Sequence, residues 1–139
     1  MKINLPKITQ AIPLADYAPE LVHDDGSPAV VYAWVNPPAA LLTRHAELRR
    51  QATEATRRIQ ATTAPSELAA AAQAAVGVGA ELAEIYAELW SQAKDPATHW
   101  TAEDVKTVAA SEANPALFRW LTGRTFAAIN AYRSGLRKN

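Results

Sequence analysis

The chain has 139 residues, of which 49% are hydrophobic and 20% charged, and its fourteen Lys and Arg balance fourteen Asp and Glu for a net charge of zero. This composition predicts a single globular domain over 1–139 and excludes a disordered chain, which would be less apolar and more highly charged. The absence of cysteine excludes disulfides, thiolate metal sites and cysteine nucleophiles. With no net charge, no global field favours nucleic acid or an anionic membrane.

Targeting and membrane signals are missing from the sequence. The N-terminus, MKINLPKITQ, lacks the continuous apolar stretch of a signal peptide. No uninterrupted apolar run approaches the ~18 residues of a membrane-spanning helix. We therefore expect a soluble protein of the cytoplasm, or of the host cytoplasm if the protein is viral.

Proline dominates the first part of the chain. Six of the nine prolines lie by position 38, and since proline interrupts helices and central strands, only short extended segments fit between them. The β-branched and aromatic run 29–35 is the best strand. Because Asp25-Gly26 is a turn signal, we expect a hairpin between 21–23 and 29–35, with 8–14 as a third, edge strand. Both faces of 29–35 are apolar, so we expect both to be covered.

A long helix is predicted from 37 to about 62. Asn36 is a candidate N-cap, and proline is tolerated in the first turn, which Pro37 and Pro38 would form. Apolar and small side chains alternate by steps of three and four, which places them on one narrow stripe. The stripe consists of Leu41, His45, Leu48, Ala52, Ala55 and Ile59.

The next helix is predicted from 65 to about 94 and has the clearest periodicity in the chain. Its stripe consists of Leu68, Ala71, Ala75, Val78, Leu82, Ile85 and Leu89. Two long helices joined by a short turn should fold back as an antiparallel hairpin. Gly77 and Gly79 each cost a helix interior roughly 1 kcal/mol relative to alanine. We therefore expect a bend or break at these glycines, or a place where another backbone comes close.

Two shorter helices are predicted in the C-terminal part. Thr101 is an N-cap followed by acidic residues, which predicts a helix from 102 to about 111. We expect this helix to bury Val105, Val108 and Ala109. Asn114, with Pro115 at the first helical position, predicts the start of the last helix. The stripe of that helix consists of Phe118, Leu121, Thr125, Ile129 and Tyr132, widened by Leu117, Trp120 and Phe126.

These elements predict a mainly α protein. Its parts are a long antiparallel helical hairpin, two shorter C-terminal helices packed on that hairpin, and a small N-terminal β-hairpin. Residues 1–36 form the extended or β element and residues 37–139 the helical body. No internal repeat or low-complexity linker divides the chain.

No group of residues has the pattern of a catalytic, metal or cofactor site. His45 has no second histidine or carboxylate three or four residues along its stripe, so we interpret it as a packed histidine. His23, Asp24 and Asp25 have the ligand types of a hard cation, but turn-forming aspartate explains them better. The glycines within 77–79 follow a helix, whereas a nucleotide fingerprint needs a preceding strand. We therefore expect no enzyme activity, no cofactor and no metal.

Two arginine pairs and four tryptophans remain as candidates for binding. Arg49-Arg50 and Arg57-Arg58 could contact phosphates, but glutamates interrupt them and no recognition-helix pattern accompanies them, so nucleic-acid binding is the weaker interpretation. Most tryptophans should belong to the core, while one or two anchor a protein partner, since Trp is enriched at binding hot spots. The residues predicted to contact a partner are Tyr32, Trp34, Leu82, Tyr86, Trp90 and Trp120.

Three stretches of the chain resemble the tail assembly chaperones of long-tailed bacteriophages. They are the turn and strand 26–35, the amphipathic segment 82–86, and 100–105 followed by 114–120. The resemblance implies a small cytoplasmic protein without enzyme activity. Such a protein holds an aggregation-prone, long helical partner of the tape-measure type through apolar faces, and self-associates.

The leading hypothesis is therefore a non-catalytic protein-binding module of this kind. One alternative is a structural virion or scaffold protein that forms a homo-oligomer. A small nucleic-acid-binding regulator is the third, and weakest, interpretation.

Overall fold

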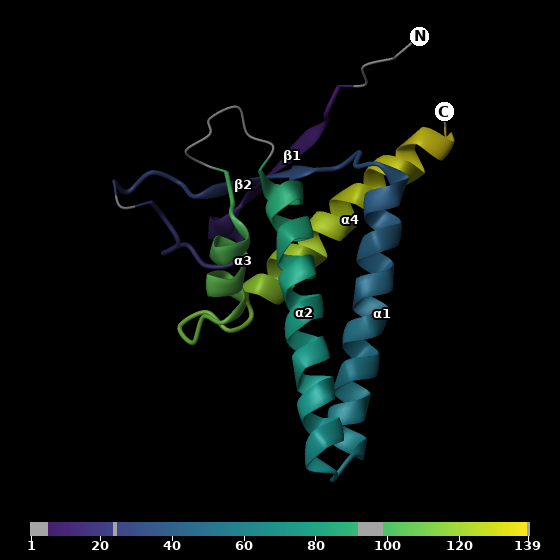
Figure 1. The fold of residues 1–139 in the computed structure, drawn as a ribbon. Helices are drawn as coiled ribbons and strands as arrows, with labels where there is room; N and C mark the ends of the chain where they lie inside the picture. The colour runs from purple at the N-terminus through teal and green to yellow at the C-terminus, as the bar shows by residue number, and fades with distance from the viewer. Residues whose placement is uncertain (1–5, 24, 92–98, 139) are drawn as a thin grey trace.

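The computed structural model describes residues 6–23, 25–91 and 99–138. A small two-stranded sheet lies at one end of a set of four helices (Figure 1). This arrangement confirms the predicted mainly α fold with a small N-terminal β element. In chain order the elements are β1 (Thr9–Pro13), a 3-10 turn (Leu14–Asp16), β2 (Val30–Trp34), α1 (Ala39–Ala61), α2 (Pro65–Trp90), α3 (Ala102–Ala109) and α4 (Leu117–Lys138).

The two long helices α1 and α2 form the predicted antiparallel hairpin, whose far end projects beyond the rest of the molecule (Figure 1). Pro65 occupies the first turn of α2, where its missing N–H is not needed. Leu48 and Ala55 of α1 and Ala71 and Val78 of α2 are buried. The two predicted stripes therefore face each other, and their small side chains let the helices pack closely.

The glycines of α2 do not interrupt it, so the predicted break was wrong. The helix continues through Gly77 and Gly79, both of which are exposed. A Cβ added at either glycine would meet no atom within 4 Å, so no backbone comes close there either. The physical reason is that Val78, between them, is buried on the α1 side. This packing holds the helix together while both glycines point to solvent.

The N-terminal sheet contains the expected strand within 8–14, as β1, but differs from the prediction at 21–23. β2 pairs antiparallel with β1, with Thr9 opposite Trp34 and Pro13 opposite Val30. The expected hairpin with 21–23 is reduced to one bridge, between Val22 and Pro28. Burial explains why β2 pairs with β1 and not with 21–23. Ile12 of β1 is buried in the core, whereas Val22 is exposed.

The strand β2 has one fully covered face. Val31, Ala33 and the following Val35 are buried, as the apolar pattern requires. On the other face Trp34 is buried, but Tyr32 remains 39% exposed. The expectation that both faces would be covered is therefore correct for the first face and wrong at Tyr32.

Asn36 does not cap α1, which begins at Ala39 without a side-chain cap. Its Oδ1 instead accepts hydrogen bonds from the Ile8 backbone N–H (2.7 Å) and from Trp34 Nε1 (2.9 Å). Its Nδ2 donates to the Pro6 carbonyl (2.9 Å). The Pro37-Pro38 step separates Asn36 from the helix, and the side chain fastens the N-terminal segment to the end of β2.

The C-terminal helices follow the predicted order with two corrections. Thr101 and Asp104 form a capping box at the start of α3, as the acidic first turn indicated. Val105 is buried in that helix, but Ala109 is exposed because α3 ends there. The last helix begins two residues later than predicted, at Leu117, since Pro115 belongs to a preceding turn.

The core lies where the second half of α2 meets β2, α3 and α4. α4 crosses the two long helices obliquely near their upper ends (Figure 1). Trp90, at 1% exposure, donates from Nε1 to Thr125 Oγ1 of α4 at 3.0 Å. Thr125 in turn donates to the Leu121 carbonyl at 2.8 Å. Both groups of this buried pair are therefore satisfied.

One helix of the described part of the chain, α2, is long and apolar enough to cross a membrane by length and composition. Its most apolar stretch is rich in alanine, and 22% of that stretch is buried in the fold. The second half of the same helix supplies Leu89 and Trp90 to the core.

Candidate functional site

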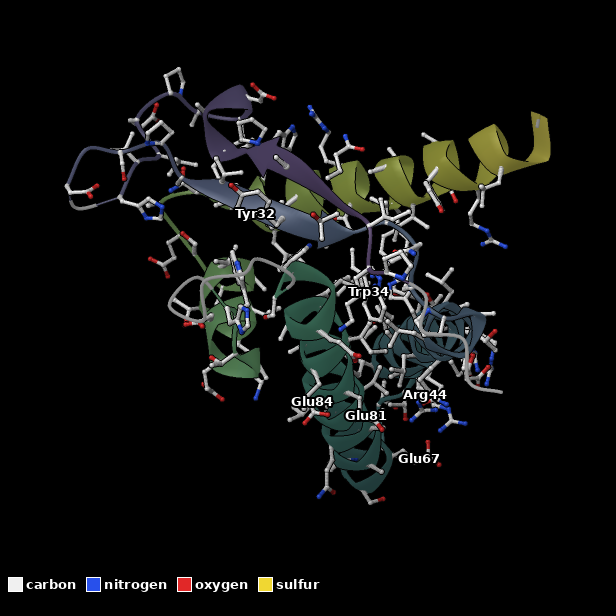
Figure 2. All side chains as sticks on the ribbon, turned by 90° about the horizontal axis from the view of Figure 1, so that it is seen from above. Tyr32, Trp34, Arg44, Glu67, Glu81 and Glu84 are labelled. Atoms are coloured by element: carbon white, nitrogen blue, oxygen red, sulfur yellow. The ribbon has the colours of Figure 1, made fainter. Side chains whose placement is uncertain are left out.

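The six residues predicted to contact a partner lie in two kinds of environment. Figure 2 labels Tyr32 and Trp34, which come from the same strand. Four of the six are buried among the chain's own side chains: Trp34, Leu82, Tyr86 and Trp90. Tyr32 is exposed, and Trp120 is half-buried. Partner binding therefore stays a prediction for Tyr32 and Trp120, while core packing accounts for the other four.

Four aromatic residues form one cluster inside the fold. Trp90 lies 5.4 Å from Tyr86 and 5.0 Å from Trp100 between ring centroids. Phe118 of α4 meets Tyr86 edge-on at 5.3 Å. These spacings suit favourable aromatic pairs. The cluster joins α2 to α4 and to the segment before α3, which is a structural role.

Trp120 occupies a separate position on α4. Its ring lies 5.5 Å from that of Tyr17, and the guanidinium of Arg124 lies 5.3 Å from its centroid. Arg124 also pairs with Asp16 at 3.5 Å. These contacts attach the turn after β1 to α4, and they leave part of the indole accessible.

His45 lies at the junction of α1, α2 and α4. Its Nε2 forms a hydrogen bond with the Tyr86 hydroxyl at 2.9 Å, and its ring stacks on Phe126 at 4.4 Å. Burial lowers the pKa of His45, with Arg49 as a smaller cause, and burial raises the pKa of Tyr86. Both groups are therefore neutral at pH 7, and the interpretation of His45 as a packed histidine agrees with this geometry.

An open cavity of about 500 Å³ lies beside this pair. Two arginines from different helices, Arg49 and Arg119, line it, and sequence reasoning did not bring them together. The only local signal was the four-residue spacing of His45 and Arg49 on one helix face. The full lining consists of His45, Arg49, Tyr86, Phe118, Arg119, Thr122, Gly123 and Phe126.

The arginines proposed for phosphate contact are mostly paired within α1. Arg50 pairs with Glu47 at 2.6 Å, and Arg57 and Arg58 both pair with Glu54. Hydrogen bonds from arginine hold the pKa of Glu47 and that of Glu54 at about 2. This exposed side of α1 is therefore compensated in charge and offers no continuous basic surface.

The segment around His23 forms a turn. The Asp25 carboxylate accepts hydrogen bonds from the Ser27 backbone N–H (2.9 Å) and the Ser27 hydroxyl (2.5 Å), while Gly26 adopts a φ of 81°. Asp24 lies outside the described residues. Within the residues that the structure describes, no group of three or more His, Cys, Asp or Glu side chains could hold a metal ion.

The first half of α2 presents an uncharged and largely apolar surface to solvent. We call the exposed residues between Glu67 and Glu81 the α2 outer face. Leu68 and Val76, at 74% exposure, are its larger side chains. Leu68 belongs to the predicted stripe but is exposed, because it lies near the projecting end of the hairpin. The face consists of Leu68, Ala69, Ala70, Ala72, Gln73, Ala74, Val76, Gly77 and Gly79.

Charged residues mark the limits of this face. Figure 2 labels Glu67, Glu81 and Glu84 on α2 and Arg44 on α1. Arg44 pairs with Glu81 at 2.7 Å, and Glu67 accepts a hydrogen bond from the Thr62 hydroxyl at 2.9 Å. Glu81 therefore links α2 to α1, and Glu67 links α2 to the segment that connects the two helices.

Comparison with known proteins yields no relative of this chain. No protein-family model, no curated protein and no solved structure matches it.

Proposed function

We propose that this chain is a non-catalytic protein-binding module of the phage tail assembly chaperone type. It holds a long helical partner, of the tape-measure kind, along the projecting α1–α2 hairpin. The observation that carries the proposal is the α2 outer face, which is exposed, uncharged and, apart from Gln73, apolar from Leu68 to Gly79. A largely apolar exposed surface of this kind is typical of a protein-interaction site.

The small side chains of this face favour a helix as the occupant. Alanine and glycine let a second helix approach closely, and the distance between packed helices depends on the side chains at their contact. Val76 would provide a larger apolar contact in the middle of the face. A regular α2 without a break at Gly77 offers a straight docking surface over several turns.

Charge distribution supports a protein over a nucleic acid as the partner. Three of the four arginines considered for phosphate contact pair with glutamates of the same helix. The α2 outer face itself carries no charge. Binding there would depend on apolar burial and would persist at high salt, unlike binding to a polyanion.

Co-expression with a helical segment of a tape-measure protein, followed by size-exclusion chromatography with light scattering, tests this function. The variant Ala72→Glu/Val76→Glu places two carboxylates on the outer face and should weaken the complex by about tenfold or more. The matched control is Thr56→Glu/Gln60→Glu, which adds the same charges at the same spacing on the exposed side of α1.

The two variants separate the outcomes. A complex that survives the control but not the outer-face variant supports the proposal. Equal binding by both variants, or no complex with the unchanged chain, refutes it.

The same face favours one other function, a homo-oligomeric scaffold in a virion. Two outer faces could pack against each other. Because the net charge is zero, copies of the chain do not repel each other at long range. Light scattering of the chain alone distinguishes the two. A stable closed ring that Ala72→Glu/Val76→Glu dissociates would favour the scaffold, and a small concentration-dependent oligomer would favour the chaperone.

A further inference from the structure

We propose that the cavity between α1, α2 and α4 binds a small aromatic anion, a carboxylate or phosphate group carried on a planar ring. The site lies at the base of the hairpin and does not involve the α2 outer face. Its components come from three helices: His45 and Arg49 of α1, Tyr86 of α2, and the α4 residues Phe118, Arg119, Thr122, Gly123 and Phe126.

The charge in the cavity comes from Arg49 and Arg119. Neither forms an ion pair with another described residue, whereas Arg44, Arg50 and Arg124 each pair with a carboxylate. The two uncompensated guanidiniums line one cavity although they come from helices far apart in the sequence, α1 and α4. Guanidinium groups are planar donors that match the oxygens of carboxylates and phosphates.

The apolar wall of the cavity suits a flat ring. Phe118 and Phe126 lie eight residues apart on one face of α4, and both are half-buried, so part of each ring is accessible. The His45 imidazole stacks on Phe126 with an interplanar angle of 27°. An aromatic ligand would continue this stack, with ring contacts worth more than their buried area alone.

The polar groups nearest the apolar wall already have hydrogen-bond partners, so the arginines are the groups that would bind the anion. His45 and Tyr86 satisfy each other at 2.9 Å, and the Thr122 hydroxyl donates to the Arg119 carbonyl at 3.0 Å. Because burial lowers the pKa of His45, the positive charge in the cavity comes from the two arginines. An anion bound by Arg49 would raise the pKa of His45, which gives a spectroscopic signal for occupancy.

Space is available for such a ligand. The volume of about 500 Å³ lies within the usual range of small-molecule sites. Gly123 contributes to it, since a Cβ added there would meet no atom within 4 Å. A larger side chain at Gly123 would occupy the cavity without changing its charge.

The test measures binding of four probes to the full chain by calorimetry and by the NMR titration of His45. The probes are benzoate, phenyl phosphate, inorganic phosphate and benzyl alcohol. We expect saturable one-to-one binding of benzoate or phenyl phosphate and a raised His45 pKa in the bound state. A preference for benzoate identifies a carboxylate ligand, and a preference for phenyl phosphate identifies a phosphate ester.

Variants locate the binding. Arg49→Gln and Arg119→Gln should each weaken binding by about tenfold, the effect of one charged hydrogen bond. Gly123→Leu should weaken binding by occupying part of the cavity. Arg57→Gln is the control, since Arg57 pairs with Glu54 away from the cavity and should leave affinity unchanged. Circular dichroism of each variant confirms that its helices remain folded.

Three results would overturn the proposal. One is inorganic phosphate or benzyl alcohol binding as tightly as the aromatic anions. The second is a loss of affinity in Arg57→Gln as large as in Arg49→Gln, which indicates non-specific attraction. The third is no saturable binding of either aromatic anion to the folded chain.

Discussion

Replacing Thr125 by valine should destabilise the protein through the buried indole of Trp90. Thr125 is 0% exposed, and its hydroxyl is the acceptor for Trp90 Nε1 at 3.0 Å. Valine keeps the shape of threonine but removes that oxygen, so the indole N–H stays buried without an acceptor. Leaving such a group unsatisfied costs about 1–3 kcal/mol. For a chain of this size, a loss of about 2 kcal/mol lowers Tm by about 4–8 °C.

Thr122→Val is the matched control for this experiment. Thr122 lies one turn earlier on α4, is half-buried, and donates only to the Arg119 carbonyl of its own helix. Its replacement should change the free energy of unfolding by less than about 0.5 kcal/mol. Urea unfolding followed by tryptophan fluorescence measures both variants. Equal stability of the two would show that Trp90 does not depend on Thr125, and would refute the reasoning.

Three further predictions follow from single features of the fold. Gly77→Ala and Gly79→Ala should each raise the free energy of unfolding by about 0.5–1 kcal/mol, because both glycines are helical and an added Cβ would meet no atom within 4 Å. A lower free energy of unfolding, measured by urea titration, would instead indicate a close contact at the glycine. Asn36→Ala should lower the free energy of unfolding by about 1–2 kcal/mol and speed hydrogen exchange at the Ile8 N–H, because that N–H loses its acceptor. An unchanged exchange rate at Ile8 would contradict this prediction. Because burial lowers the folded-state pKa of His45 below 6.5, the unfolded chain binds protons first, so this group reduces stability as pH falls below about 6.5. His45→Gln should flatten that part of the stability–pH curve, and an unchanged curve would show that His45 is not the cause.

The two halves of α2 lie in different environments. The second half of α2 is buried and aromatic, and Trp90 connects it to α4. The first half presents the α2 outer face to solvent, with only small apolar side chains besides Leu68, Gln73 and Val76. Substitutions on the outer face should therefore leave the core intact.

Much of the helical architecture could be predicted from the sequence because helices depend on local interactions. The three- and four-residue steps from Leu48 to Ala55 and from Val78 to Leu89 correctly placed the buried sides of α1 and α2. The Thr101 capping box and the turn at Gly26 are likewise local, since donor and acceptor lie within a few residues.

Only the tertiary structure decided the features that depend on distant contacts. The partner of β2 was chosen by the burial of Ile12, which no short-range pattern reveals. Asn36 looked like a helix cap, yet its side chain bonds to residues 28 and 30 positions away. Gly77 looked like a break, but packing of neighbouring Val78 keeps α2 continuous. The candidate cavity belongs to this second class. Arg49 and Arg119 line one cavity only because α4 crosses α1 and α2, and helix periodicity carries no information about such a crossing.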